Sequence, residues 1–246
     1  MHNETLDLLH QHQSIRAFTD KPVSDEQVRE MILAATAGPN MQNYQPVTFI
    51  EIKDQALKTK ITEQVGMKYI QTATRFFVLT VDFNKDLIGL NAEQKAIVED
   101  RIQHYQLLEG GIVSASIALG RAQIAAESMG LGTVTMAGAM GAFELYEKEL
   151  NLPRYVKAIM GFSVGYPDQN PGVKPKLPLS GSLMEGAYHQ DQMEAAVAEY
   201  NETMKDYFKE RGMDTDWTQH TAKLFAQMKP NVKLSEYPQA KGFNLK

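Results

Sequence analysis

The stretch from Gly110 to Met129 constrains the fold of this chain more than any other. Its apolar residues recur at helical spacing, and most are small: Ile112, Ala115, Ile117, Ala118, Ala122 and Ala125. Small side chains let a partner helix approach closely, and Gly130 is a suitable residue to end a helix. The pattern therefore predicts a long helix that lies centrally or at an interface.

Four stretches are typical of strands: Val47–Ile52, Phe76–Asp82, Leu131–Ala137 and Val156–Gly165. Phe76–Asp82 is nearly continuously apolar, as in a strand that is buried on both faces. Strands and helices do not alternate in a regular βαβ rhythm, so the sequence predicts one α+β domain with helices on both faces of a small sheet. Capping signals predict where two helices begin or end: a capping box at Ser24–Gln27 starts one, and Gly66 ends another. With apolar periodicity, these signals predict helices at Asn3–His10, Ser24–Ala37, Ala56–Val65, Ala142–Leu150, Gln190–Arg211 and Trp217–Met228.

Other segments are less regular. Residues 84–106 are polar and are predicted to form an excursion with some helix. Gly138–Gly141 is predicted to be a tight turn, and residues 168–186 a proline-rich loop. The tail, residues 230–246, is polar and poorly periodic, as in an extended arm that lies on another subunit. We therefore predict a single domain over residues 1–246, which includes the excursion and the C-terminal arm.

Composition narrows the functional classes. The chain has 246 residues, a formal net charge of −5 with scattered cations, and no cysteine. Nucleic acid is therefore not expected as the main partner, and thiolate catalysis and cysteine-ligated metal are excluded. No apolar run approaches the roughly 20 residues that cross a bilayer, and the N-terminus is not a secretory signal. A cytoplasmic protein without membrane contact is the expectation.

The segment His12–Thr19 carries candidate ligand-binding residues. His12, Ser14 and Arg16 alternate, so in extended chain their hydrogen-bond donors point the same way, toward an anion or an electron-rich ring edge. The alternative is a polar surface turn. Lys174 and Lys176 alternate with prolines in a stiffened loop, which taken alone is a solvated linker. Together, the two segments have the chemistry to clamp one phosphate dianion.

Several common motifs are absent. No G-x-G-x-x-G follows a strand, and no G-x-x-x-x-G-K-[ST] occurs, which argues against Rossmann and P-loop sites. His10 and His12 lack a third ligand at metal-binding spacing, so no metal site is expected. Ser14 lacks the context of a nucleophile elbow. Backbone N–H groups at Gly138–Gly141 are able to face a ligand, but a plain turn explains the glycines equally well.

The chain resembles the nitroreductase family of FMN-dependent oxidoreductases, and in particular its NADPH-preferring branch. The resemblance covers nearly the whole chain and depends on the order and spacing of several motifs. These are His12-x-Ser14-x-Arg16 with Phe18-Thr19-Asp20-x-Pro22, Ala125-Ala-Glu-Ser-Met-Gly-Leu-Gly132, Gly161-Phe-Ser-Val-Gly-Tyr-Pro167, Asn170-Pro171 with Lys174-Pro-Lys-Leu-Pro178, Tyr207-Phe-x-x-Arg-Gly212, and Asp216-Trp217.

This resemblance implies the α+β nitroreductase fold, with a small and mostly antiparallel sheet flanked by helices. It implies a homodimer that exchanges C-terminal arms and binds FMN at two interface sites. His12, Ser14, Lys174 and Lys176 would hold the FMN phosphate, and Gln13 belongs to the same cofactor-binding segment. Other roles follow from the same resemblance. Arg16 would lie near flavin N1 and O2, Asn40, Met41 and Gln42 would border the flavin, and Met136, Ala137 and Gly138 would line the ring near N5.

Three positions depart from the family pattern and bear on substrate choice. Asn40–Gln42 replace the usual serines, and Met67, counted among the cofactor-binding residues, stands where the branch often has glutamine. Arg211 matches the arginine that binds the 2′-phosphate of NADPH, but the following loop, Met213–Asp216, carries two aspartates. A modest preference for NADPH over NADH is therefore expected.

By the same resemblance, the activity is a ping-pong hydride transfer through flavin N5 from NAD(P)H to a nitroaromatic, a quinone or a flavin. The cofactor carries the chemistry, no side chain acts as a general acid, and Arg16 stabilises charge at N1–O2. Two alternatives stay open. One is a flavin reductase that supplies free reduced FMN, and the other is a flavin-binding redox sensor without turnover.

Overall fold

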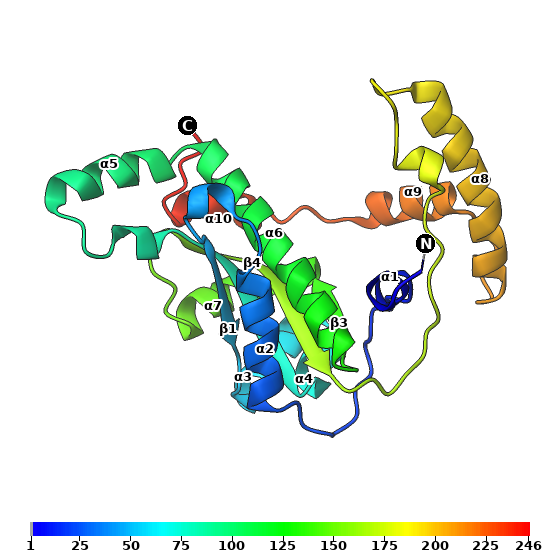
Figure 1. Cartoon of the computed structure of the whole chain (residues 1–246), viewed down its shortest axis with the longest axis horizontal. Helices are drawn as coiled ribbons and strands as arrows, with labels where there is room; N and C mark the ends of the chain where they lie inside the picture. Colours follow the sequence, from blue (N-terminus) through cyan, green and yellow to red (C-terminus); the bar gives the residue numbers. More distant parts are fainter. Residues whose placement is uncertain (1) are drawn as a thin grey trace. The chain divides into compact units, whose positions relative to one another are not determined.

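The computed structural model describes residues 2–246 and divides them into two units. One comprises residues 2–171 together with 232–246, and the other comprises residues 172–231 (Figure 1). The first unit contains the sheet. No helix within the described residues is long and apolar enough to span a membrane. The prediction of one domain over the whole chain stays a prediction.

The sheet of the first unit has four strands in the order β1-β2-β4-β3. They are β1 (Val47–Glu51), β2 (Arg75–Asp82), β3 (Gly132–Met136) and β4 (Val156–Gly165), and every neighbouring pair is antiparallel. A register shift between Leu79 and Thr80 interrupts the β2–β4 pairing. All four predicted strands are present, and β3 ends one residue before the predicted Ala137.

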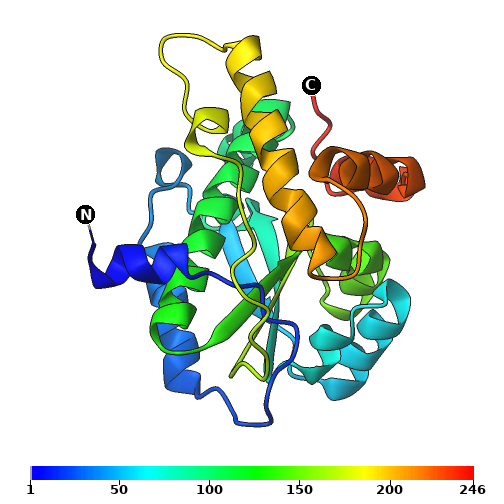
Figure 2. The ribbon, with the colours of Figure 1, turned by 90° about the vertical axis from the view of Figure 1, so that its right-hand side faces the viewer.

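Strand β2 is apolar on both faces because helices cover both sides of the sheet. Phe76 and Val78 pack with α3 (Gln55–Val65), α4 (Lys68–Thr72) and α7 (Phe143–Glu149). Phe77 and Leu79 pack on the opposite face with α2 (Asp25–Thr36) and α6 (Tyr105–Ser128). Figure 2 shows α3 and α4 in cyan on one side of the sheet, and α2 in blue with α6 in green on the other. The continuous apolar pattern of β2 therefore reflects its position between two layers of helices.

Helix α6 is the predicted small-residue helix, and it starts five residues earlier than predicted. A Cβ on Gly111 would lie 2.7 Å from Val81 Cγ1, so the helix contacts the sheet at backbone distance. Its Ala118 and Ala122 are buried toward α2. The predicted capping box of α2 is also present, with reciprocal hydrogen bonds between Ser24 and Gln27. The prediction that α6 is central is thus confirmed.

The excursion contains η2 (Asn84–Leu87) and α5 (Ala92–Ile102), and α1 (Glu4–His10) opens the chain as predicted. The tail differs from the expected extended arm because it contains α10 (Val232–Ala240). Tyr237 of α10 is 2% exposed, and its hydroxyl accepts a hydrogen bond from the Ala158 N–H at 3.1 Å. The tail has few apolar residues and a proline at 238, so periodicity gave no helical signal.

One other local prediction was wrong, and one short helix was missed. Gly138–Gly141 is not an isolated tight turn but part of the 3-10 helix η3 (Ala137–Ala142). The short helix α4 follows Gly66, which takes a left-handed φ of 72° after α3 as its predicted cap. Five residues are too few to show helical periodicity, which is why α4 was missed.

The second unit is built from η4 (Leu179–Gly181), α8 (Gln190–Lys209) and α9 (Trp217–Gln227). The apolar cluster of this unit lies on one face of α8 and comprises Tyr200, Met204 and Phe208. The Tyr200 ring packs edge-on against the Trp217 ring, with the ring centres 5.4 Å apart. Helix α8 ends at Lys209, so Arg211 lies just beyond the helix that was predicted to contain it. The predicted start at Gln190 is confirmed.

Candidate functional site

The segment from His12 to Arg16 lies alongside strand β3. The Ile15 N–H donates to the Thr133 carbonyl at 2.9 Å, and Ser14 forms a bridge with the same residue. Gly132 makes this approach possible, because a Cβ there would lie 2.6 Å from Ile15 Cγ1. Ile15 is thereby buried, while Ser14 is half-buried and Arg16 is exposed. Ile15 is thus buried between two less buried neighbours, as in extended chain, whereas the convergence of the His12, Ser14 and Arg16 donors stays a prediction.

The His12 imidazole is held by a polar network that sequence reasoning missed. Its Nδ1 lies 2.8 Å from Glu127 Oε1, and that same oxygen accepts a hydrogen bond from Thr133 Oγ1 at 2.9 Å. Gln123 Nε2 lies 3.1 Å from His12 Nδ1. Glu127 belongs to the Ala125-Ala-Glu-Ser motif of α6, which was the available signal. Gln123 Nε2 also lies 3.2 Å from His12 Nε2, so a ligand at that ring nitrogen would share it with this amide or displace the amide.

Arg16 places a guanidinium near the start of α4. Its Nη1 donates to the Ser14 carbonyl at 3.4 Å, and its backbone N–H donates to Gln169 Oε1 at 3.2 Å. Its Cζ lies 6.0 Å from the centre of the Tyr69 ring. The exposed guanidinium therefore sits beside an aromatic side chain, where an anionic or electron-rich group can reach it.

Met136, Ala137 and Gly138 lie at the far end of β3, where the strand passes into η3. Ala137 and Gly138 are exposed, and Met67 lies over Gly138, since a Cβ there would meet the Met67 methyl group at 2.2 Å. Met136 lies three positions after Thr133 in the strand, which is a distance of about 10 Å. The β3 edge thus presents a polar, cationic end and a backbone-lined end, an arrangement suited to an elongated ligand.

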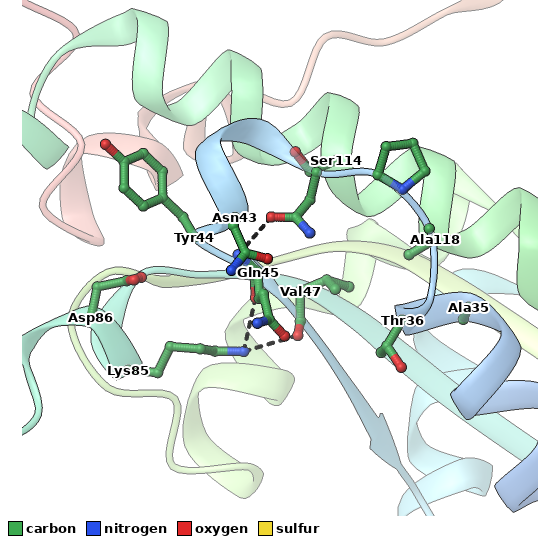
Figure 3. Close-up of a pocket in the computed structure, with 13 residues that line it drawn as sticks. Ala35, Thr36, Asn43, Tyr44, Gln45, Val47, Lys85, Asp86, Ser114 and Ala118 are labelled. Atoms are coloured by element: carbon green, nitrogen blue, oxygen red, sulfur yellow. Dashed lines mark hydrogen bonds between the residues drawn. The ribbon is translucent and has the colours of Figure 1, made fainter.

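The loop of Asn40, Met41 and Gln42 lies elsewhere on α6. The Met41 N–H donates to Ser114 Oγ at 3.0 Å, and Met41 Sδ lies 2.3 Å from the position of a Cβ on Gly110. A surface hollow of about 570 Å³ adjoins this loop, and its lining includes Asn40, Lys85 and Ser114 (Figure 3). The loop is thus anchored on α6 beside an open hollow.

The structure does not bring this loop to the His12 network within one chain. The loop contacts α6 at Ser114 and the network contacts it at Glu127, which are about 20 Å apart at 1.5 Å per residue. Near Ser114, α6 exposes apolar side chains, with Val113 54% and Ile117 38% exposed. The predicted flavin-contacting residues of this unit therefore form two separate groups.

In the second unit, Lys174 and Arg211 flank the ring of Tyr207. Arg211 Cζ lies 3.6 Å from the ring centre and Lys174 Nζ lies 5.9 Å from it. The Tyr200 hydroxyl donates to the Pro175 carbonyl at 2.8 Å, which ties the loop of Lys174 and Lys176 to α8. Both lysines are exposed. Tyr207 was not singled out from the sequence, although it begins the Tyr207-Phe-x-x-Arg-Gly212 motif.

Comparison with known proteins decides the family. The Nitroreductase family model matches residues 9–166, and the model of the nitroreductase family C-terminal domain matches residues 174–246. The chain belongs to the nitroreductase family. As a nitroreductase-family protein it has the predicted α+β fold: the solved NfrA1 nitroreductase of Bacillus subtilis superposes with a TM-score of 0.92 over 99% of this chain and 100% of that one, at 27% identity.

Two curated relatives are more similar to this chain in sequence. An FMN reductase [NAD(P)H] of Bacillus subtilis is 35% identical over 231 residues, which is 92% of each chain. An oxygen-insensitive NADPH nitroreductase of Salmonella typhimurium is 35% identical over 221 residues, which is 88% of each chain. The family and branch predicted from the sequence motifs are confirmed.

Proposed function

We propose that this chain is an FMN-dependent NAD(P)H oxidoreductase. The supporting observation is the β3 edge, where an oriented histidine, a hydroxyl and an exposed guanidinium lead to the exposed backbone of Ala137 and Gly138. Relatives named as an FMN reductase and an NADPH nitroreductase support the same assignment. FMN, when bound, supplies the hydride-accepting and hydride-donating chemistry between NAD(P)H and an electron acceptor.

The residues at this edge fit the parts of FMN. His12 and Ser14 are hydrogen-bond donors suited to a phosphate, and Glu127 keeps the His12 ring in one orientation. Arg16 carries the positive charge suited to the flavin pyrimidine, where negative charge develops on reduction. The bare Cα of Gly138 and the flexible Met67 side chain suit a flat ring. The residues of this chain would therefore bind and orient FMN and balance its charge.

A homodimer follows from the separation of the two groups along α6. One ring is not able to contact both the β3 edge and the Asn40–Gln42 loop of the same chain across about 20 Å of helix. A second copy packed on the exposed apolar face of α6 would supply the missing loop. We therefore propose that each FMN site combines the β3 edge of one subunit with the loop of its partner.

The alternative within the same family is a flavin reductase that releases reduced FMN, in line with the relative named FMN reductase. The two are distinguished by retention of FMN on dialysis. The proposal itself is tested by titrating FMN into the purified protein and measuring its mass in solution. One FMN per subunit and a dimer are expected, whereas a colourless monomer that ignores added FMN would contradict the proposal.

Two basic residues that the family resemblance assigns to FMN, Lys176 and Arg16, are expected to differ in what they control. Lys176→Ala should mainly weaken FMN binding, because it removes a charge-assisted contact of about 1.5–3 kcal/mol. Arg16→Gln should mainly lower the reduction potential of bound FMN and slow its reduction. Dissociation constants and potentials of both variants check this division. An equal loss of FMN affinity with unchanged potentials in both variants would disprove it.

Arg211 is expected to favour NADPH over NADH only modestly. It is exposed and stacked on Tyr207, and an exposed charge contact contributes about 1 kcal/mol or less. Asp214 and Asp216 line a neighbouring hollow and oppose a phosphate, while the nearby Lys205 is paired with Glu202 at 2.6 Å. Arg211→Ala should therefore raise the KM for NADPH and leave NADH kinetics unchanged. Equal losses for both nucleotides would make Arg211 a purely structural cation.

A further inference from the structure

The loop that follows α2 has a backbone conformation that its residues do not favour. Gln42, Asn43 and Gln45 have φ values of 45°, 59° and 51°, in the left-handed region where a Cβ is strained. None of the three is glycine, and only Asn43 is of a residue type that adopts this conformation readily. Such a backbone persists only where its surroundings hold it, and it is common at functional sites.

Lys85, at the root of the excursion, holds the end of this loop. Its Nζ donates to the carbonyl oxygens of Gln45 at 3.1 Å and Val47 at 3.0 Å, and to Thr48 Oγ1 at 3.2 Å. The three N–H groups of the ammonium thus match three acceptors on one stretch of chain. Figure 3 shows the Lys85 side chain reaching across the hollow to Gln45 and Val47.

A carboxylate fixes the ammonium in turn. Asp82 Oδ2 lies 3.5 Å from Lys85 Nζ and accepts a hydrogen bond from Thr48 Oγ1 at 2.7 Å. The other oxygen of Asp82 accepts the Asn84 N–H at 3.1 Å. Lys85 is only 35% exposed. The Lys85 ammonium is therefore held in a fixed position at the junction of β1, β2 and η2.

Hydrogen bonds within the loop connect Gln45 and Tyr44 to the residues that are proposed to border the flavin. The Gln45 N–H donates to Asn40 Oδ1 at 2.9 Å, and the Tyr44 hydroxyl donates to Gln42 Oε1 at 2.8 Å. The Met41 N–H is held separately by Ser114. The start of the loop is thus anchored on α6, whereas its strained end is anchored by Lys85.

We infer that Lys85 is a positioning residue that holds the Asn40–Gln45 loop in its left-handed conformation and thereby sets how substrates fit against the flavin. The inference rests on the proposed function. It assigns to the excursion a part in substrate recognition that does not require direct contact with a ligand. Without Lys85, the loop would have to be ordered each time a substrate binds, which weakens binding more than it slows the chemistry.

The test compares Lys85→Met with Lys95→Met, which removes the same charge from an exposed position on α5. Hydrogen exchange of the apo protein is measured over residues 38–47, with β4 as the internal reference. Lys85→Met should speed exchange in this loop by about tenfold, the effect of losing a hydrogen bond to a charged group. Exchange in β4 should not change. Equal loop exchange in the two variants would overturn the inference.

A glycine rescue tests the mechanism. In the FMN-loaded enzyme, Lys85→Met should raise the KM for the electron acceptor several-fold with little change in kcat. Gln45→Gly added to Lys85→Met should lower that KM again, because glycine takes a positive φ without strain. Failure of this rescue would overturn the inference. If the wild-type protein does not bind FMN, the proposed function fails, whereas the exchange experiment still decides the role of Lys85.

Discussion

Replacing Phe243 by alanine is expected to lower the free energy of unfolding by about 3–5 kcal/mol, as for other large core side chains. Phe243 is 0% exposed, and its ring packs edge-on against Phe83 at 6.3 Å and Tyr155 at 6.1 Å. Gly242 before it has a φ of 92°, and a Cβ there would lie 2.7 Å from Tyr155. The ring thus fills a site bounded by two other aromatic rings, and its loss is expected to leave a cavity.

Urea unfolding at a fixed protein concentration measures this effect. The matched control is Phe225→Ala, since Phe225 is 68% exposed and its loss should change stability by about 0.5 kcal/mol or less. The Asn244 side chain donates to Gln103 Oε1 at 2.6 Å, so loss of Phe243 should also speed hydrogen exchange in α5. Equal small effects of the two substitutions would show that the tail does not pack into the core in solution.

Replacing Glu147 by glutamine is expected to cost about 3–5 kcal/mol, because it leaves a buried ammonium without its counter-charge. Lys241 Nζ lies 2.6 Å from Glu147 Oε2 and also donates to the Leu152 carbonyl at 2.8 Å, and its side chain is only 6% exposed. The Tyr237 hydroxyl donates to the other oxygen of Glu147. Burial, reinforced by this hydrogen bond, raises the pKa of Tyr237, so the phenol stays a donor. One carboxylate therefore holds both Tyr237 of α10 and Lys241, the residue that follows the helix.

Helix α7 offers a matched control. Glu144 pairs with Lys233 of α10 at 2.9 Å, but the two side chains are 57% and 70% exposed. Glu144→Gln should therefore cost at most about 1 kcal/mol. The two variants remove the same charge from the same helix and differ in burial. Equal losses of stability would contradict the buried docking of α10 on α7.

The strands and most helices were predictable because their signals are local. The run from Phe76 to Asp82 identified a strand covered on both faces, and the Ser24–Gln27 capping box marked the start of α2. The helix α10 was not predictable, because the hydrogen bonds that stabilise it join Tyr237 to Glu147 and Ala158, which lie far away in the sequence. Tertiary contacts of this kind leave no periodic pattern.

The candidate site was predictable in part. The alternation of His12, Ser14 and Arg16 indicated convergent donors, and strand β3 provides the straight edge that the alternation needs. Glu127 was quoted as part of a motif, but its contact with His12 depends on how α6 packs against β3. Lys85 gave no signal, because its role depends on the left-handed backbone of residues without a glycine marker. The contact of Glu127 with His12 and that of Lys85 with its loop both depend on the three-dimensional path of the chain. The local sequence does not reveal that path.

Anaerobic mixing of the FMN-loaded protein with NADPH tests the central claim most directly. The account predicts that the visible absorption band of oxidised flavin disappears in one step at one NADPH per FMN. It further predicts that the band returns when a quinone or nitroaromatic is added after the nucleotide has been removed. A band that persists with both NADPH and NADH would contradict the assignment of this chain as an NAD(P)H oxidoreductase.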